Sequence, residues 1–158
     1  MKLTEEKIEN FVISFLTNLG YEHINAATIA PDSDKPERQL ERQKYDDVIL
    51  KNRLTHAINT INPHIPLEAR EQAQRIITTI SSPDLINNNE TFHKYLTEGI
   101  DIEYQLDGIT RGDKVWLIDF THPENNEFLA VNQFTIIENN HNRRPDIILF
   151  INGLPLVV

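Results

Sequence analysis

The stretch PDIILFINGLPLVV, residues 145–158, consists of two apolar runs joined by Asn152-Gly153. Asn-Gly favours a two-residue turn with positive φ at both positions, so the two runs are predicted to pair as a β-hairpin. One acidic residue, Asp146, stands at the head of the first run, directly after Pro145. A carboxylate is therefore expected at the open end of a buried hairpin, where it would suit an active site.

Strand patterns also precede the hairpin. Apolar and polar residues alternate over residues 100–106, which is typical of a half-buried strand, and Asp107-Gly108 follows as a turn signal. Two more strands are expected over residues 115–120 and 128–137. Together with the hairpin, these segments predict a mixed, largely antiparallel β-sheet.

The first half of the chain has helical periodicity. Apolar residues recur at helical spacing from Thr4 to Leu19, so a first helix is expected there, with Thr4 as its cap and Gly20 at its end. Because helices come first and strands later, the fold class is predicted to be α+β, with N-terminal helices packed on the sheet. Further helices are expected over residues 36–61, with a break near 45–47, over 66–80 and over 89–97.

Basic residues lie among the apolar positions of the second predicted helix. They could contact phosphate, but a solvated helix face is the more common role of such residues. These residues are Arg38, Arg42, Lys44, Lys51 and Arg53.

Length and composition predict a single soluble domain over residues 1–158. The chain is 39% hydrophobic, has a net charge of −9 and contains no cysteine, so it has neither disulfides nor thiolate metal sites. No apolar run approaches the ~18 residues of a membrane helix, and the N-terminus lacks a signal-peptide pattern, so a cytoplasmic protein is expected. The negative charge argues against a free-standing nucleic-acid binder, but not against a nuclease to which other subunits deliver DNA.

Two carboxylates, Asp119 and Asp146, lie in apolar strand context. A buried acid without a partner is costly, so each is expected to have a hydrogen-bond donor, a cation or water beside it. Two interpretations of Asp146 stay open: a turn residue paired with Arg143 or Arg144, or a ligand of Mg²⁺, which prefers oxygen ligands. A nuclease site would need at least one more carboxylate, and usually a lysine, nearby in space. After Asp146 the sequence contains neither.

Six ordered stretches carry a resemblance to a known family. They are NRLTHAIN (52–59), NPHIP (62–66), FHKYLTEGI (92–100), LIDF (117–120), NEFLAVNQF (126–134) and RRPDIILFINGLPLV (143–157). In these stretches the chain resembles the N-terminal domain of the restriction (R) subunit of type I restriction-modification enzymes. The resemblance covers essentially the whole chain, and the ordered set is far more specific than any single piece.

The resemblance implies a nuclease core of the PD-(D/E)xK type. Asp146 matches the motif aspartate, a ligand of the catalytic Mg²⁺. A helix glutamate approaches the same site in the family; Glu9 is the better match and Glu5 the alternative, although spacing alone makes both an ordinary solvated flank. In the family the strand continues into Glu-x-Lys, which supplies the second metal ligand and the lysine that orients or activates water. That glutamate would fall two positions beyond Val158, so the resemblance implies a truncated core.

The resemblance also implies partners. The full subunit would hydrolyse phosphodiester bonds of unmethylated double-stranded DNA, coupled to ATP-driven translocation, together with modification and specificity subunits. No Gly-x-x-x-x-Gly-Lys-Ser/Thr loop occurs in this sequence, so ATP is expected to bind only in motor domains outside residues 1–158. Arg143 and Arg144 are then candidates for residues near the DNA.

Two hypotheses about function follow. In a nuclease domain, Asp146 and either Glu9 or Glu5 should converge at one end of the mixed sheet, and residues 1–158 alone should not cut DNA. The alternative is a non-catalytic protein–protein interaction domain, in which the same carboxylates are ordinary members of salt bridges.

Overall fold

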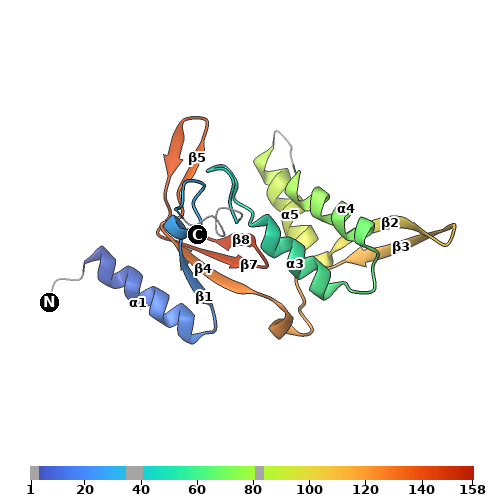
Figure 1. Ribbon diagram of the computed structural model, residues 1–158, viewed down its shortest axis with the longest axis horizontal. Coiled ribbons are helices and arrows are strands. Elements are labelled where there is room, and N and C mark those ends of the chain that lie inside the picture. Colours follow the sequence, from blue (N-terminus) through green and yellow to red (C-terminus); the bar gives the residue numbers. More distant parts are fainter. Residues whose placement is uncertain (1–3, 35–40, 81–83) are drawn as a thin grey trace. The chain divides into compact units, whose positions relative to one another are not determined.

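The computed structural model describes residues 4–34, 41–80 and 84–158 (Figure 1). The chain divides into two compact units. The first, called the sheet unit, comprises residues 1–53 and 127–158, and the second, called the inserted unit, comprises residues 54–126. Helices and strands occur in both units, so the predicted α+β class is confirmed.

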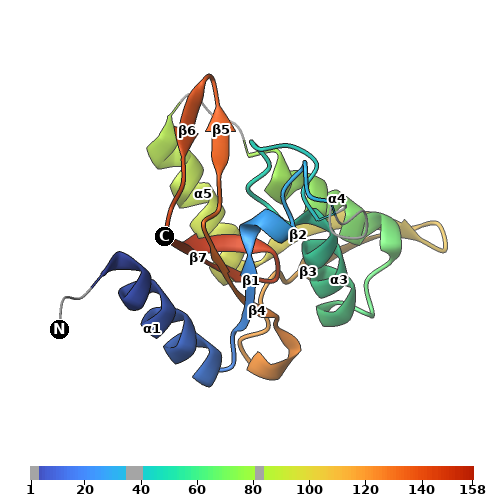
Figure 2. The same cartoon turned by 60° about the vertical axis from the view of Figure 1, so that its left-hand side comes forward.

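Four strands form the sheet of the sheet unit, in the order β1-β4-β7-β8. They are β1 (Glu22–Asn25), β4 (Phe128–Asn132), β7 (Ile147–Ile151) and β8 (Leu154–Val157). β1 runs parallel to β4 and the other neighbours are antiparallel, so the sheet is mixed, as predicted (Figure 2). Two fully buried aromatic side chains, Phe134 and Phe150, lie in its core with ring centroids 5.5 Å apart.

The hairpin predicted at Asn152-Gly153 is confirmed, with φ of 54° and 78° at the two turn residues. Asn152 is fully buried, its Oδ1 accepts a hydrogen bond from the Glu127 backbone N–H at 2.8 Å, and its own N–H donates to the Glu127 carbonyl at 2.9 Å. The Gly153 carbonyl accepts from the Leu50 N–H at 2.9 Å. These bonds fix the closed end of the hairpin, so the strand that begins beside Asp146 has a defined register.

The third predicted strand, over residues 128–137, is wrong in its length. β4 ends at Asn132 because Gln133 adopts a φ of 58°, which turns the chain out of the ladder. The chain then forms a second hairpin from β5 (Ile136–Glu138) and β6 (His141–Arg143).

Helix α1 (Glu5–Asn18) occupies the predicted first helix, and Gly20 follows it with a φ of 98°. Thr4 stands at the cap position, but its side chain makes no capping hydrogen bond. Leu16 is the buried apolar residue of this helix, and much of the predicted apolar stripe is exposed. Periodicity therefore located the helix correctly without showing what covers its apolar side. The exposed stripe residues are Ile8, Phe11, Phe15 and Leu19.

The inserted unit combines helices with one β-hairpin. α3 (Lys51–Ile61) leads into it and is followed by α4 (Leu67–Thr78), α5 (Leu85–Glu98), β2 (Ile100–Leu106) and β3 (Ile109–Val115). β2 and its turn at Asp107-Gly108 are as predicted, with φ of 53° and 77° in the turn. α5 starts earlier than the expected residue 89 because Asp84 caps it by accepting a hydrogen bond from the Ile86 N–H at 2.9 Å.

Two further predictions about this part of the chain are wrong. Residues 41–50 are not helical, so α3 is shorter than the helix expected over 36–61, whose first residues lie outside the described ones. The strand expected over 115–120 is misplaced, because β3 covers Ile109–Val115 and shares only Val115 with it. β3 ends there because the buried Asn62 side chain binds both backbone groups of Trp116. Asn62 Oδ1 accepts a hydrogen bond from the Trp116 N–H, and Asn62 Nδ2 donates one to the Trp116 carbonyl, both at 2.8 Å. The Asn62 side chain therefore satisfies backbone groups that would otherwise pair with a neighbouring strand.

The described residues also contain two short 3₁₀ helices, η1 (Ala26–Thr28) and η2 (Pro123–Asn125). Across residues 4–34, 41–80 and 84–158, no helix has both the length and the hydrophobicity needed to span a bilayer.

Candidate active site

Asp146 lies at the open end of the hairpin, directly before β7, and its side chain is exposed. Its backbone carbonyl accepts a hydrogen bond from the Gln133 N–H at 2.9 Å, which places it beside the end of β4. Within the described residues, the Asp146 carboxylate makes no hydrogen bond or ion pair, and neither Arg143 nor Arg144 is paired with it. The interpretation of Asp146 as a salt-bridged turn residue therefore lacks its expected partner.

Glu9 of α1 reaches the same end of the sheet. Its Oε1 accepts a hydrogen bond from Asn132 Nδ2 at 2.8 Å, and its Oε2 accepts one from Gln133 Nε2 at 3.1 Å. Gln133 thus contacts the Glu9 carboxylate through its side chain and Asp146 through its backbone. Glu5 is exposed and makes no such contact among the described residues, so packing distinguishes two glutamates that spacing alone left equivalent.

His23 of β1 extends this polar network. His23 Nε2 lies 3.0 Å from Asn132 Oδ1. Because Asn132 donates to Glu9 through its Nδ2, its Oδ1 is the acceptor, and the His23 ring nitrogen is the donor. Asn132 is only 8% exposed, so its amide is held from both sides in a buried position.

Sequence reasoning missed Asn132, Gln133 and His23 as site residues. A signal for the first two was available: two amides follow the apolar run FLAV of β4, and antiparallel pairing brings the end of β4 next to the start of β7. No comparable signal marked His23, because its role depends on the parallel pairing of β1 with β4.

Carboxylate and amide oxygens from α1, β4 and the start of β7 lie at this end of the sheet. Mg²⁺ takes oxygen ligands and usually only one or two protein carboxylates, with waters completing its shell. Glu9 and Asp146 can supply two carboxylates. In the part of the chain that the structure describes, no group of three or more His, Asp or Glu side chains is suited to hold a metal ion.

Asp119 has a structural role in the inserted unit. Its Oδ1 accepts hydrogen bonds from the Thr121 and His122 N–H groups at 3.0 and 2.9 Å, and its Oδ2 accepts one from Asn125 Nδ2 at 2.8 Å. The hydrogen bond from Asn125, followed by those from the backbone, lowers the pKa of Asp119 below its ordinary value. The donors expected for this carboxylate are therefore provided by its own turn.

Two of the basic residues considered as phosphate contacts are held inside the sheet unit. Arg42 is 2% exposed, donates to the carbonyls of Tyr45 and Asp47, and lies 3.9 Å from the centroid of the Phe134 ring. Burial lowers the pKa of Arg42. For Arg53, burial lowers the pKa, but hydrogen bonds and charges of surrounding glutamates outweigh it and raise the pKa. Arg42 and Arg53 therefore fit neither role considered from the sequence, a solvated helix face or a contact to phosphate.

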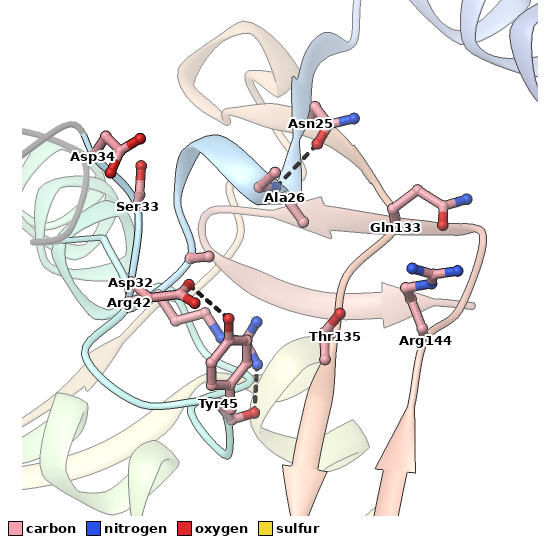
Figure 3. A pocket seen from close by; sticks show the side chains of 12 residues that line it. Asn25, Ala26, Asp32, Ser33, Asp34, Arg42, Tyr45, Gln133, Thr135 and Arg144 are labelled. Atoms are coloured by element: carbon pink, nitrogen blue, oxygen red, sulfur yellow. Dashed lines mark hydrogen bonds between the residues drawn. The ribbon is translucent and has the colours of Figure 1, made fainter.

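A polar pocket of about 340 Å³ adjoins the candidate site within the sheet unit (Figure 3). Gln133 belongs to both, since it lines the pocket and also binds Glu9. Other lining residues come from the end of β1, from the segment after η1 and from the approach to β7. They include Asn25, Asp32, Tyr45, Thr135 and Arg144.

Replacing Asn132 by alanine should loosen α1 and release Glu9. The substitution removes one hydrogen bond to a carboxylate, and such a bond contributes about 1.5–3 kcal/mol. We expect amide hydrogen exchange in α1 to accelerate by about 10- to 100-fold, because little of the helix's apolar stripe is buried. Hydrogen exchange with mass spectrometry or NMR measures this directly.

Asn87→Ala is the matched control for this substitution. It removes a similar amide-to-carboxylate bond, from Asn87 Nδ2 to Asp84 Oδ2 at 2.9 Å, in the inserted unit. We expect it to leave exchange in α1 unchanged. Equal protection of α1 in the wild-type chain and in the Asn132→Ala variant would contradict the role given to Asn132.

Comparison with known proteins identifies the family. The family described as type I restriction enzyme R protein N terminus matches residues 2–158. A putative type I restriction enzyme MjaIXP endonuclease subunit of Methanocaldococcus jannaschii is 37% identical over 161 residues, covering 99% of this chain and 15% of that protein. The type I restriction enzyme HindI endonuclease subunit of Haemophilus influenzae is 36% identical over 157 residues, covering 99% of this chain and 14% of that protein. The chain therefore belongs to the family of type I restriction enzyme R protein N termini.

Proposed function

We propose that this chain is the nuclease domain of a type I restriction subunit and that the full subunit, with this domain's residues in its active site, hydrolyses DNA phosphodiester bonds with Mg²⁺. The observation that carries the proposal is the placement of Asp146 and Glu9 at one end of a mixed sheet, in a chain of this family. Relatives named as endonuclease subunits support the same class of reaction. A PD-(D/E)xK core is part of the proposal.

Asp146 and Glu9 would hold the magnesium ion in this site. A bound Mg²⁺ polarises a phosphoryl oxygen and lowers the pKa of water, which gives a nucleophile at neutral pH. The protein's own contribution is orientation. Asn132 and Gln133 fix both oxygens of Glu9, and His23 fixes Asn132, as outer partners commonly do for metal ligands. Two accepted hydrogen bonds leave further lone pairs on the Glu9 carboxylate for a cation.

We propose that the remaining parts of the machinery belong to a longer subunit. The chain spans about one seventh of the length of the two relatives, which is consistent with a Glu-x-Lys and an ATP-driven motor beyond Val158. Modification and specificity subunits would help to hold the DNA, because a net charge of −9 gives this chain little attraction for it. Residues 1–158 alone are then expected not to cut DNA.

Asp146→Asn in the longer subunit, assembled with its partner subunits, tests the proposal. We expect cleavage of unmethylated DNA to fall by at least about 100-fold, because a ligand of the metal is lost and the metal's charge stabilisation is worth several kcal/mol. DNA-stimulated ATP hydrolysis should persist, since it would depend on the motor. Gel assays of cleavage and a phosphate-release assay measure the two activities.

Asp107→Asn provides the control. It makes the same chemical change in the exposed turn between β2 and β3, and Asn-Gly is as favourable a turn as Asp-Gly. This variant should cut DNA at the wild-type rate. If the Asp146→Asn subunit cut DNA at the wild-type rate, the nuclease assignment of Asp146 would be wrong.

An interaction domain without chemistry is the second candidate function. It is favoured by the exposed apolar residues of α1 and by the acidic inserted unit, which carries five Lys and Arg against eleven Asp and Glu. Assembly of the subunit without any dependence of cleavage on Asp146 would favour this candidate.

A further inference from the structure

The pocket described above adjoins the end of the sheet that carries Glu9 and Asp146. Asn25 at the end of β1 and Gln133 after β4 both line it. Gln133 connects it to the candidate active site through its bonds to Glu9 and to the Asp146 carbonyl. Any ligand in this pocket would therefore be a close neighbour of the reacting phosphate.

The two sides of the pocket differ in charge. Figure 3 shows Arg144 and Gln133 on one side and Asp32, Ser33 and Asp34 on the other, with Tyr45 and Thr135 between them; Arg42 lies beside Asp32, and its guanidinium binds backbone carbonyls. One side can donate hydrogen bonds to an anion, and the other can accept them from amino or hydroxyl groups. A nucleotide has this polarity, with a phosphate at one end and the donor groups of a base at the other.

Arg144 is the cation available to such a phosphate. It is exposed and forms no hydrogen bond or ion pair with another residue of the described parts. Arg42, which also lines the pocket, already donates to two backbone carbonyls and is buried against Phe134. A free guanidinium binds phosphate through parallel hydrogen bonds, so Arg144 has the geometry for this contact.

Tyr45 presents an aromatic ring between the two sides, and the Arg42 guanidinium lies 5.5 Å from the centroid of that ring. Tyr45 donates its hydroxyl hydrogen to Asp32 at 2.6 Å, and this hydrogen bond raises the pKa of Tyr45. The bond fixes the ring and leaves the other carboxylate oxygen of Asp32 as an acceptor. Aromatic faces stack on bases of any sequence, which suits a subunit that does not itself read the recognition site.

Size restricts the ligand further. A volume of about 340 Å³ is at the small end of the ~300–1,000 Å³ range of ligand pockets. A volume of this size suits a ligand no larger than about one nucleotide. We propose that this pocket binds a single nucleotide of the strand next to the cut, with Arg144 on its phosphate. The proposal rests on the nuclease function proposed above.

Arg143 and Arg144 allow a sharp test in the 158-residue chain. Both are exposed neighbours of the same charge, but Arg144 lines the pocket and Arg143 belongs to β6. The probes are a fluorescein-labelled single-stranded oligodeoxynucleotide and the four deoxynucleoside monophosphates, used with EDTA so that binding is separated from cleavage. Fluorescence anisotropy follows the first, and NMR chemical-shift changes follow the second.

We expect Arg144→Ala to weaken binding by about 10-fold or more, as for a hydrogen bond to a charged group, and Arg143→Ala to weaken it less than about 2-fold. Thr135→Val, which keeps the side-chain shape, should weaken it several-fold. Binding of the oligonucleotide alone would identify a DNA strand as the ligand, and equal binding of the monophosphates would identify a site for any nucleotide. Equal losses of affinity in the two arginine variants, or no binding by the wild-type chain, would overturn the proposal that this pocket binds a nucleotide.

Failure of the pocket proposal can be distinguished from failure of the nuclease assignment. Loss of the pocket proposal with cleavage still dependent on Asp146 leaves the nuclease assignment standing. Conversely, nucleotide binding that depends on Arg144, together with cleavage independent of Asp146, would remove the nuclease assignment and keep the pocket.

Discussion

Replacing Phe150 by alanine should destabilise the sheet unit by about 3–5 kcal/mol, the usual cost of deleting a buried phenyl ring. Phe150 is fully buried in β7, and its ring packs on Phe134 at a tilt of 57°. Truncation would leave a cavity lined by Leu129 and Ile148, among others in the same core. Because total stabilities are about 5–15 kcal/mol, the loss is a large part of what the chain has.

Urea unfolding followed by far-UV circular dichroism measures this loss. The chain's one tryptophan, Trp116, lies in the inserted unit, so its fluorescence follows that unit separately. Phe11→Ala is the matched control, since it makes the same change at a side chain that is 72% exposed, and it should alter stability by less than about 0.5 kcal/mol. Similar losses in both variants would show that Phe150 is not a core residue.

Arg53→Met should lower the free energy of unfolding of the sheet unit by about 2–3 kcal/mol. Arg53 donates to both oxygens of Glu41 at 2.7 and 2.8 Å, donates to Glu127, and lies 3.6 Å from Glu22. Its removal leaves three carboxylates facing one another. Breaking a buried ion pair costs about 3–5 kcal/mol, and the partial exposure of Glu22 and Glu127 reduces this through solvent screening.

Salt dependence and a lysine control variant test whether that loss of stability is electrostatic. High salt should reduce the defect of Arg53→Met, because the remaining repulsion acts between partly exposed charges. Lys51→Met changes an exposed neighbour whose Nζ lies 3.6 Å from Asp47 Oδ1, and it should lower the free energy of unfolding by less than about 1 kcal/mol. If Arg53→Met unfolds at the wild-type urea concentration, the cluster contributes nothing to folding.

Local sequence patterns predicted the elements whose structure depends on neighbouring residues. The turns at Asp107-Gly108 and Asn152-Gly153 were predictable because positive φ favours Asn, Asp and Gly. α1 and β2 followed from their periodicity. The end of an element was not predictable where it depends on a side chain far away in the sequence. β3 is the example, because it ends where the Asn62 side chain binds both backbone groups of Trp116.

The candidate site shows the same division. Asp146 was recognisable because a carboxylate heads an apolar run. The choice between Glu5 and Glu9 required the structure, because it depends on where α1 lies against the end of β4. His23 was missed because its role exists only once β1 pairs with β4, whereas the amide of Asn132 directly after the apolar run of β4 was a signal that sequence reasoning did not use.

The parallel pairing of β1 with β4 also sets the order in which this chain can fold. About 100 residues separate the two strands, and joining the ends of so long a flexible loop costs about 4 kcal/mol of chain entropy. The intervening residues include the whole inserted unit, whose β2-β3 pairing is local. Prior folding of that unit shortens the flexible loop. The inserted unit should therefore acquire its structure early, and the sheet that carries Asp146 should be the last part to close.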